Sequence, residues 1–203
     1  MSFQTLRWAI VVIASLSVGL QAADRRAITH EDVWLMKRVG RPKLSPDGRW
    51  VAYALAQLAY DSKDQSSDIW IVRADGSGAP RQMTRTKSAE AGIDWSPDSR
   101  RIAFSAKRDS DESAQIYVLD LLEGGEAERI TSISSGARLP KWSPDGNTLL
   151  FVSEVYPGAK TDEENRKAEK EVRGRKYNAH VYEGFPIRYW DAWLDERRPR
   201  LFV

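Results

Sequence analysis

Hydrolysis by a serine nucleophile is the first chemistry to test against this sequence, because it needs a serine, a histidine base and a carboxylate. The chain has two histidines, His30 and His180, and no G-x-S-x-G motif of the kind that exposes a nucleophilic serine on a strand-to-helix turn. His30 lies in a short predicted helix that Thr29 caps, and His180 lies in a predicted loop. Neither has a supporting context, so we expect no catalytic residue among these 203 residues.

Metal and cofactor chemistry have even fewer candidates. Two acidic segments, DSKDQSSD from Asp61 and DSDES from Asp109, lack the glycine and the final glutamate of a calcium-binding EF-hand loop. We interpret them as polar hairpin loops. The chain has no cysteine, and no glycine-rich phosphate loop stands between a strand and a helix. We therefore expect no cofactor and no metal site.

An aromatic segment, YNAHVYEGFPIRYWDAW at 177–193, is the remaining candidate for binding. The aromatic side chains could form a platform for a ligand, or they could pin a long loop onto the sheet beneath it. We favour packing, and the substrate-binding residues stay unknown at this point. The residues concerned are Tyr182, Phe185, Tyr189, Trp190 and Trp193.

The overall charge is close to balance, with 31 basic and 29 acidic residues. Nucleic-acid binding needs a basic face that neutralises phosphates. A net charge of +2 gives no sign of such a face. We therefore expect no nucleic-acid partner.

The N-terminal residues have the pattern of a secretory signal peptide at 1–23. Arg7 precedes an uncharged run, Ala9 to Leu20, and the small residues Ala22 and Ala23 suit cleavage. The run is short for a transmembrane helix, which needs about 20 apolar residues, although an uncleaved anchor is the alternative. We expect a periplasmic or secreted protein without stable membrane association after cleavage.

A repeated hairpin turn organises the remaining chain, 24–203. Ser-Pro-Asp begins at Ser45, Ser96 and Ser143, with spacings of 51 and 47 residues. Periods of 40–50 residues are typical of four-stranded propeller blades. Proline suits the first central position of the turn, and a left-handed glycine closes it. The second copy has Ser99 in the glycine position, which costs about 1 kcal/mol, so we expect this turn to be the weakest or slightly different.

Further spacings repeat with the turn. From Trp70 to Thr84 there are 14 residues, and the same number separates Tyr117 from Thr131. Each threonine then precedes the next Ser-Pro-Asp by 12 residues. The strands that leave the turns contain successive apolar residues, which indicates sheets covered on both faces. Such sheets stack around an axis, as propeller blades do.

We therefore predict an all-β fold, an incomplete β-propeller of four-stranded blades, two complete and a third partial. The third unit departs from the period, because Phe202 takes the position of Trp70 only after a long insertion. A short helix at about His30–Arg38 precedes the first blade. The predicted bounds are about 40–84 for blade 1, about 90–131 for blade 2, from about 137 for blade 3, and 156–197 for its insertion.

The insertion is predicted to contain a charged helix. Thr161 and Glu164 have capping-box spacing, and acidic residues fill the first turn. Asp162–Arg166 and Glu169–Arg173 are spaced for favourable pairs. We interpret this helix as a solvated surface element, with a lid or a partner contact as the alternative.

These residues resemble a known family. The SPDG hairpins resemble the WD40-like repeats of TolB-type propellers. ITHEDVWLMKRVGRPKLSPDGRWVAY, at 28–53, resembles the start of the propeller in prolyl oligopeptidase-family serine peptidases. AHVYEGFPIRYWDAWLDERRPRLFV, at 179–203, is similar to their acylaminoacyl-peptidase and dipeptidyl-peptidase V branch.

The resemblance implies a propeller that restricts and positions peptide substrates for an α/β-hydrolase domain. No hydrolase motif is present, so we expect an N-terminal fragment of a secreted serine peptidase, inactive alone. The alternative is a non-enzymatic periplasmic binding propeller like TolB. TolB-type proteins place an α/β domain before the propeller, whereas a short helix stands here, which favours the peptidase. A short protein that completes its propeller by oligomerising is a third alternative, and the sequence leaves the oligomeric state open.

Overall fold

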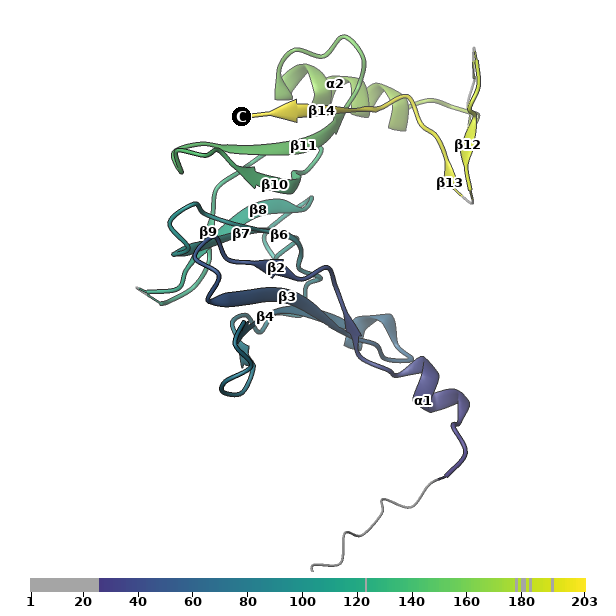
Figure 1. Cartoon of the computed structure of the whole chain (residues 1–203). Coiled ribbons are helices and arrows are strands. Elements are labelled where there is room, and N and C mark those ends of the chain that lie inside the picture. Colours follow the sequence, from purple (N-terminus) through teal and green to yellow (C-terminus); the bar gives the residue numbers. More distant parts are fainter. Residues whose placement is uncertain (1–25, 123, 178, 180–181, 183, 191) are drawn as a thin grey trace, which may run out of the picture.

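The computed structural model describes residues 26–203 except 123, 178, 180–181, 183 and 191. The predicted signal peptide at 1–23 lies outside these residues. Antiparallel sheets follow one another along the chain and stack face to face, giving a propeller-like arrangement (Figure 1). None of the helices in the described part has the length and apolar composition to cross a membrane.

The first sheet has four strand positions, because two short strands share one edge of its longest strand. β1 and β2 pair with successive parts of β3, and β4 pairs along the other edge of β3. Tyr53 lies opposite Trp70 in this register. The strands are β1 (Arg38–Val39), β2 (Lys43–Leu44), β3 (Trp50–Gln57), β4 (Ser66–Arg73) and β5 (Arg81–Gln82).

The second sheet repeats this order as β6-β7-β8-β9. Phe104 lies opposite Tyr117, the same register as Tyr53 and Trp70. The strands are β6 (Ala91–Trp95), β7 (Arg101–Ala106), β8 (Gln115–Asp120) and β9 (Glu128–Arg129).

The 14-residue spacing corresponds to one recurring hydrogen bond. The Thr84 hydroxyl accepts a hydrogen bond from the backbone N–H of Ile69, at 2.9 Å. The Thr131 hydroxyl accepts the equivalent bond from Ile116, also at 2.9 Å. Threonine therefore satisfies a β-strand donor at the place where the last short strand of each unit ends.

The third sheet has the order β10-β11-β14. Phe202 lies opposite Phe151, and their rings stack 5.6 Å apart, so Phe202 occupies the register position of Trp70 and Tyr117. The segment 156–197 separates β11 from β14 and contains a separate two-stranded hairpin. The strands are β10 (Arg138–Trp142), β11 (Leu149–Val155), β14 (Arg198–Phe202), and in the hairpin β12 (Arg188–Tyr189) and β13 (Ala192–Trp193).

Successive residues of β7 point to opposite faces of the second sheet and contact different neighbouring sheets. Phe104 is buried in a cluster that includes Ile69 of the first sheet. Ala103 is buried in a second cluster that includes Phe151 of the third sheet. Burial of apolar side chains on both faces drives the stacking. The prediction that the strands are covered on both faces is confirmed for the second sheet.

The first helix is shorter than predicted. α1 (His30–Trp34) begins at its Thr29 cap in a complete capping box, but it ends at Trp34 rather than near Arg38. Arg38 and Val39 instead form β1 against β3. Pairing with an existing strand satisfies their backbone groups, and this overrides the helical pattern.

α2 (Asp162–Arg173) begins at the predicted Thr161 cap, whose hydroxyl accepts a hydrogen bond from the Glu164 N–H. The capping box is half formed, because the Glu164 carboxylate accepts its hydrogen bond from the Lys160 N–H. The pairs Asp162–Arg166 and Glu169–Arg173 are present. The Asn165 side chain is buried and its carbonyl oxygen accepts from the Tyr156 N–H, so polar contacts tie this charged helix to the end of β11.

Candidate functional site

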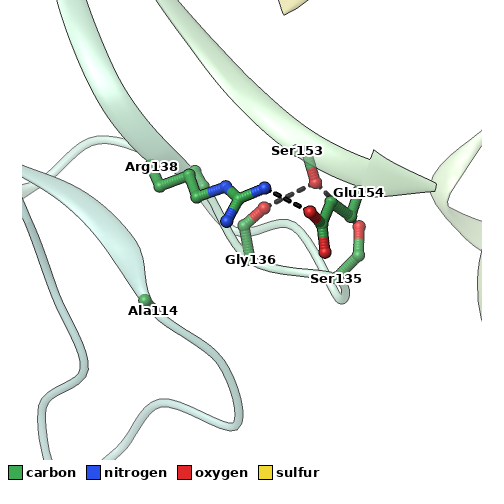
Figure 2. A pocket seen from close by; sticks show the side chains of 7 residues that line it. Ala114, Ser135, Gly136, Arg138, Ser153 and Glu154 are labelled. Atoms are coloured by element: carbon green, nitrogen blue, oxygen red, sulfur yellow. Dashed lines mark hydrogen bonds and ion pairs between the residues drawn. The ribbon is translucent and has the colours of Figure 1, made fainter. Parts of the chain in front are cut away.

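A small hollow lies where the second and third sheets meet (Figure 2). The Ser153 hydroxyl donates to the carbonyl oxygen of Gly136 at 2.5 Å, and the Ser135 hydroxyl lies 2.8 Å from that of Ser153. Arg138 and Glu154 form an ion pair across the mouth. The hollow has a volume of about 110 Å³ and is lined by Ala114, Ser135, Gly136, Ala137, Arg138, Ser153 and Glu154.

This arrangement ties β11 to the segment that leads into β10, and it does not activate a nucleophile. Ser153 donates its hydroxyl hydrogen to a carbonyl, and a serine nucleophile must instead donate it to a base. The hollow is also smaller than the roughly 300–1,000 Å³ of sites that enclose drug-sized ligands. We therefore interpret it as part of the packing between sheets.

The two histidines do not support a catalytic triad within the described residues. His30 stacks on Trp34, with ring centroids 5.9 Å apart, on an exposed helix. His180 lies outside the described residues. The absence of catalytic residues predicted from the sequence therefore stays a prediction for the whole chain.

The acidic segments serve local structure. The Asp61 carboxylate caps a single 3-10 turn, η1 (Ser62–Asp64), by accepting from the Lys63 N–H. Asp111 of the second segment is buried, and its carboxylate accepts from the Tyr117 hydroxyl at 2.6 Å. Across the described residues, no group of three or more metal-ligating side chains comes together.

Two buried carboxylates form a charged cluster at the junction of the first and second sheets, which sequence reasoning missed. Glu90 accepts hydrogen bonds from the hydroxyls of Thr84 and Thr86, and Arg108 lies 3.9 Å from it. Burial raises the pKa of Glu90, and the hydrogen bond from Thr84 and the charge of Arg108 offset part of this rise.

Asp111, the second carboxylate, has the opposite balance. Burial by itself would raise its pKa, but hydrogen bonds from Tyr117 and from the Arg108 N–H, with the charges of Arg129 and Arg108, hold the pKa below its ordinary value. Burial and the bond to Asp111 raise the pKa of Tyr117 to about 12. No sequence pattern marks either of these two carboxylates. The repeat marks only a nearby polar position, because Asp68 and Gln115 each stand two residues before an aromatic strand residue.

The three Ser-Pro-Asp turns share one hydrogen-bond pattern. In each turn the serine hydroxyl donates to the aspartate two residues later. This bond is the largest cause that lowers the pKa of Asp47, Asp98 and Asp145. Ser99 adopts a left-handed φ of 61°, close to the 72° of the equivalent glycines.

Ser99 also links two turns, because its hydroxyl accepts a hydrogen bond from the Asp47 N–H at 3.0 Å. We expect Ser99→Ala to lower the free energy of unfolding by about 0.5–1.5 kcal/mol, since it loses this bond and keeps the left-handed φ. We expect Ser99→Gly to be neutral within about 0.5 kcal/mol, since relief of a strain of about 1 kcal/mol offsets the lost bond. Urea denaturation measures both.

Gly48→Ala provides the control for this comparison. Gly48 has a φ of 72°, and an added Cβ would meet no other atom within 4 Å. Alanine at this position therefore reports only the cost of the left-handed conformation. If Ser99→Ala were as stable as the unchanged chain, the link between the turns would contribute nothing.

The aromatic segment is mostly exposed, so the packing interpretation is wrong for four of its five residues. Tyr182 donates its hydroxyl to the Leu194 carbonyl at 2.6 Å and is partly buried. The other four lie on or beside the β12–β13 hairpin, which extends away from the stacked sheets (Figure 1). A two-stranded hairpin has no layer of its own to cover its side chains. The exposed residues are Phe185, Tyr189, Trp190 and Trp193.

Comparison with known proteins identifies the family. Residues 18–171 match the model of the TolB β-propeller domain, PD40, and the chain belongs to this family. An acylaminoacyl peptidase from Pyrococcus horikoshii has a similar fold, with a TM-score of 0.58 and 18% identity over 83% of this chain and 23% of that one. The predicted resemblance to TolB-type repeats is confirmed.

Two curated relatives are named as peptidases. Dipeptidyl-peptidase 5 from Porphyromonas gingivalis is 29% identical over 102 residues, which cover 50% of this chain and 15% of the relative. The uncharacterized peptidase YuxL from Bacillus subtilis is 32% identical over 85 residues, covering 42% and 13%. These matches confirm the resemblance to peptidase propellers, and they span about one seventh of each relative.

Proposed function

We propose that this chain is the N-terminal propeller part of a secreted serine peptidase that acts on peptides. The observation that carries the proposal is the similarity of both curated relatives, named as peptidases, to this propeller segment. The propeller gates and positions substrates, and a separate hydrolase domain supplies the nucleophile. Export to the periplasm or the medium is part of the proposal, on the strength of the signal-like residues 1–23.

The chain alone is proposed to be inactive. The described serines beside the hollow donate to neighbouring oxygens, and His30 lies on an exposed helix away from them. A β-propeller typically closes with four to eight blades, whereas the described residues form three stacked sheets and the separate β12–β13 hairpin. The proposed activity therefore depends on residues beyond those described.

Reading the gene beyond the codon for Val203 tests the proposal. We expect the frame to continue into further SPDG-type units and then a G-x-S-x-G motif. Further units without a hydrolase segment would overturn the peptidase proposal in favour of a TolB-like binding propeller. The family match itself gives that alternative its support.

A further inference from the structure

A second, larger hollow lies at one end of the first sheet, where the β3–β4 loop meets the segment that follows β5. Its volume is about 430 Å³. The cations Lys63, Arg85 and Lys87 line it, and none of them forms an ion pair with a carboxylate among the residues that the structure describes. The remaining lining residues are Asp64, Gln65, Ser66, Asp68, Gln82 and Thr86.

The floor of this hollow is built from buried polar groups. Asp68 is 4% exposed, and its two carboxylate oxygens accept from the Gln82 side-chain amide at 3.0 Å and the Thr86 N–H at 3.1 Å. Neutral donors therefore occupy both oxygens of Asp68. Asp64 is exposed at the rim, so the residues that line the hollow carry three positive and two negative charges. The buried Glu90 lies behind Thr86 and has its own cation in Arg108, 3.9 Å away.

The second repeat unit shows that the fold does not require these cations. The equivalent positions lie 47 residues later, where Gln115 replaces Asp68 and two serines, Ser132 and Ser134, replace Arg85 and Lys87. The Gln115 side-chain oxygen accepts from the Ile133 N–H at 3.1 Å, the same bond that Asp68 receives from Thr86. The same backbone hydrogen bond therefore forms in both units, whether the flanking residues are serines or cations.

The second unit also shows what this place can hold. The N–H and the hydroxyl of Ser134 both donate to one carboxylate oxygen of Asp162, at 2.9 and 2.7 Å. Asp162 is the first residue of α2, so a carboxylate from the insertion occupies the position next to Ser134. Lys87 stands at the matching place in the first unit, where the hollow is open.

We propose that the hollow between Lys63, Arg85 and Lys87 binds a carboxylate of an acidic peptide. A guanidinium and two ammonium groups recognise such a group through charge-assisted hydrogen bonds. The carboxylate comes from an acidic side chain or from a free C-terminus. This inference rests on the proposed function, because it assigns the propeller a preference among peptide substrates.

Fluorescence anisotropy with the whole chain tests this assignment. Three labelled peptides of equal length serve as probes: an amidated peptide with glutamates, its amidated glutamine counterpart, and the glutamine peptide with a free C-terminus. We compare the unchanged chain with the triple variant K63Q/R85Q/K87Q. The matched control K167Q/K170Q/K176Q removes the same charge from exposed lysines on and just after α2.

The unchanged chain is expected to bind a carboxylate-bearing peptide, and the hollow variant to bind it about tenfold more weakly. The control variant should change affinity by less than about twofold. Binding of the glutamate peptide alone assigns an acidic side chain, and binding of the free-acid peptide assigns a C-terminus. The three altered side chains are exposed, and circular dichroism verifies the fold.

Equal weakening in both variants would overturn the proposal, because it would show general charge attraction. No preference for carboxylate peptides would overturn it as well. The experiment measures binding and not hydrolysis, so a failure of this inference can be distinguished from a failure of the proposed function. A hydrolase domain in the reading frame with no binding at the hollow defeats this inference alone.

Discussion

Replacing Phe104 by alanine is expected to lower the free energy of unfolding by about 3–5 kcal/mol. Phe104 has no exposed surface, and it packs against Tyr117 with ring centroids 6.1 Å apart. It lies in the cluster that joins the first sheet to the second, so alanine leaves a cavity at their interface. Urea denaturation followed by circular dichroism measures the change in the midpoint and in the slope.

Two further variants serve as controls for the size of the Phe104→Ala effect. Phe104→Leu keeps most of the volume and is expected to cost less than about 1.5 kcal/mol. Tyr189→Ala removes an aromatic ring that is 75% exposed, and it should stay within about 0.5 kcal/mol. A loss below 1 kcal/mol for Phe104→Ala would show that the first and second sheets do not share one core.

The parts of the fold that local chemistry determines were predictable from the sequence. Proline, aspartate and a left-handed residue specify each hairpin turn, and the turn fixes the register of the strands on either side. That register carries over to the third sheet, where Phe202 lies opposite Phe151 despite the long insertion. The same local rules predicted Thr161 as the cap of α2.

The errors have tertiary causes. α1 ends early because Arg38 and Val39 find a partner in β3, and no local signal in the chain reports that partner. The exposure of Trp190 and its neighbours depends on what lies next to the hairpin, which periodicity does not describe. The burial of the Glu90 and Asp111 carboxylates depends on partners that are distant in the sequence. Arg108 lies 3.9 Å from Glu90. Tyr117 and Arg129, in two other strands, contact Asp111.

Asp111→Ala is expected to lower the free energy of unfolding at pH 7 by about 1.5–3 kcal/mol. Asp111 is 7% exposed, and alanine leaves the buried Tyr117 hydroxyl without its acceptor. Arg129 lies 2.9 Å from the other carboxylate oxygen, in a direction that makes the contact an ion pair rather than a hydrogen bond. Because the Arg129 side chain is 38% exposed, water can solvate it, which argues against the roughly 3–5 kcal/mol of a fully enclosed pair.

Asp109→Ala is the matched control, since Asp109 is an exposed carboxylate in the same loop. It should change the free energy of unfolding by less than about 0.5 kcal/mol. Equal losses in the two variants would mean that loop composition, rather than the buried contact of Asp111, determines stability.

The effect of Asp111 should also depend on pH in one direction. Its pKa is lower in the folded chain than in the unfolded chain, where it is about 3.9. The carboxylate therefore contributes its stability above the unfolded pKa and loses it as the pH falls through the folded pKa. Unfolding curves of the unchanged chain and Asp111→Ala should lie furthest apart near neutral pH and converge below about pH 4. A constant separation across this range would assign the loss to packing and not to charge.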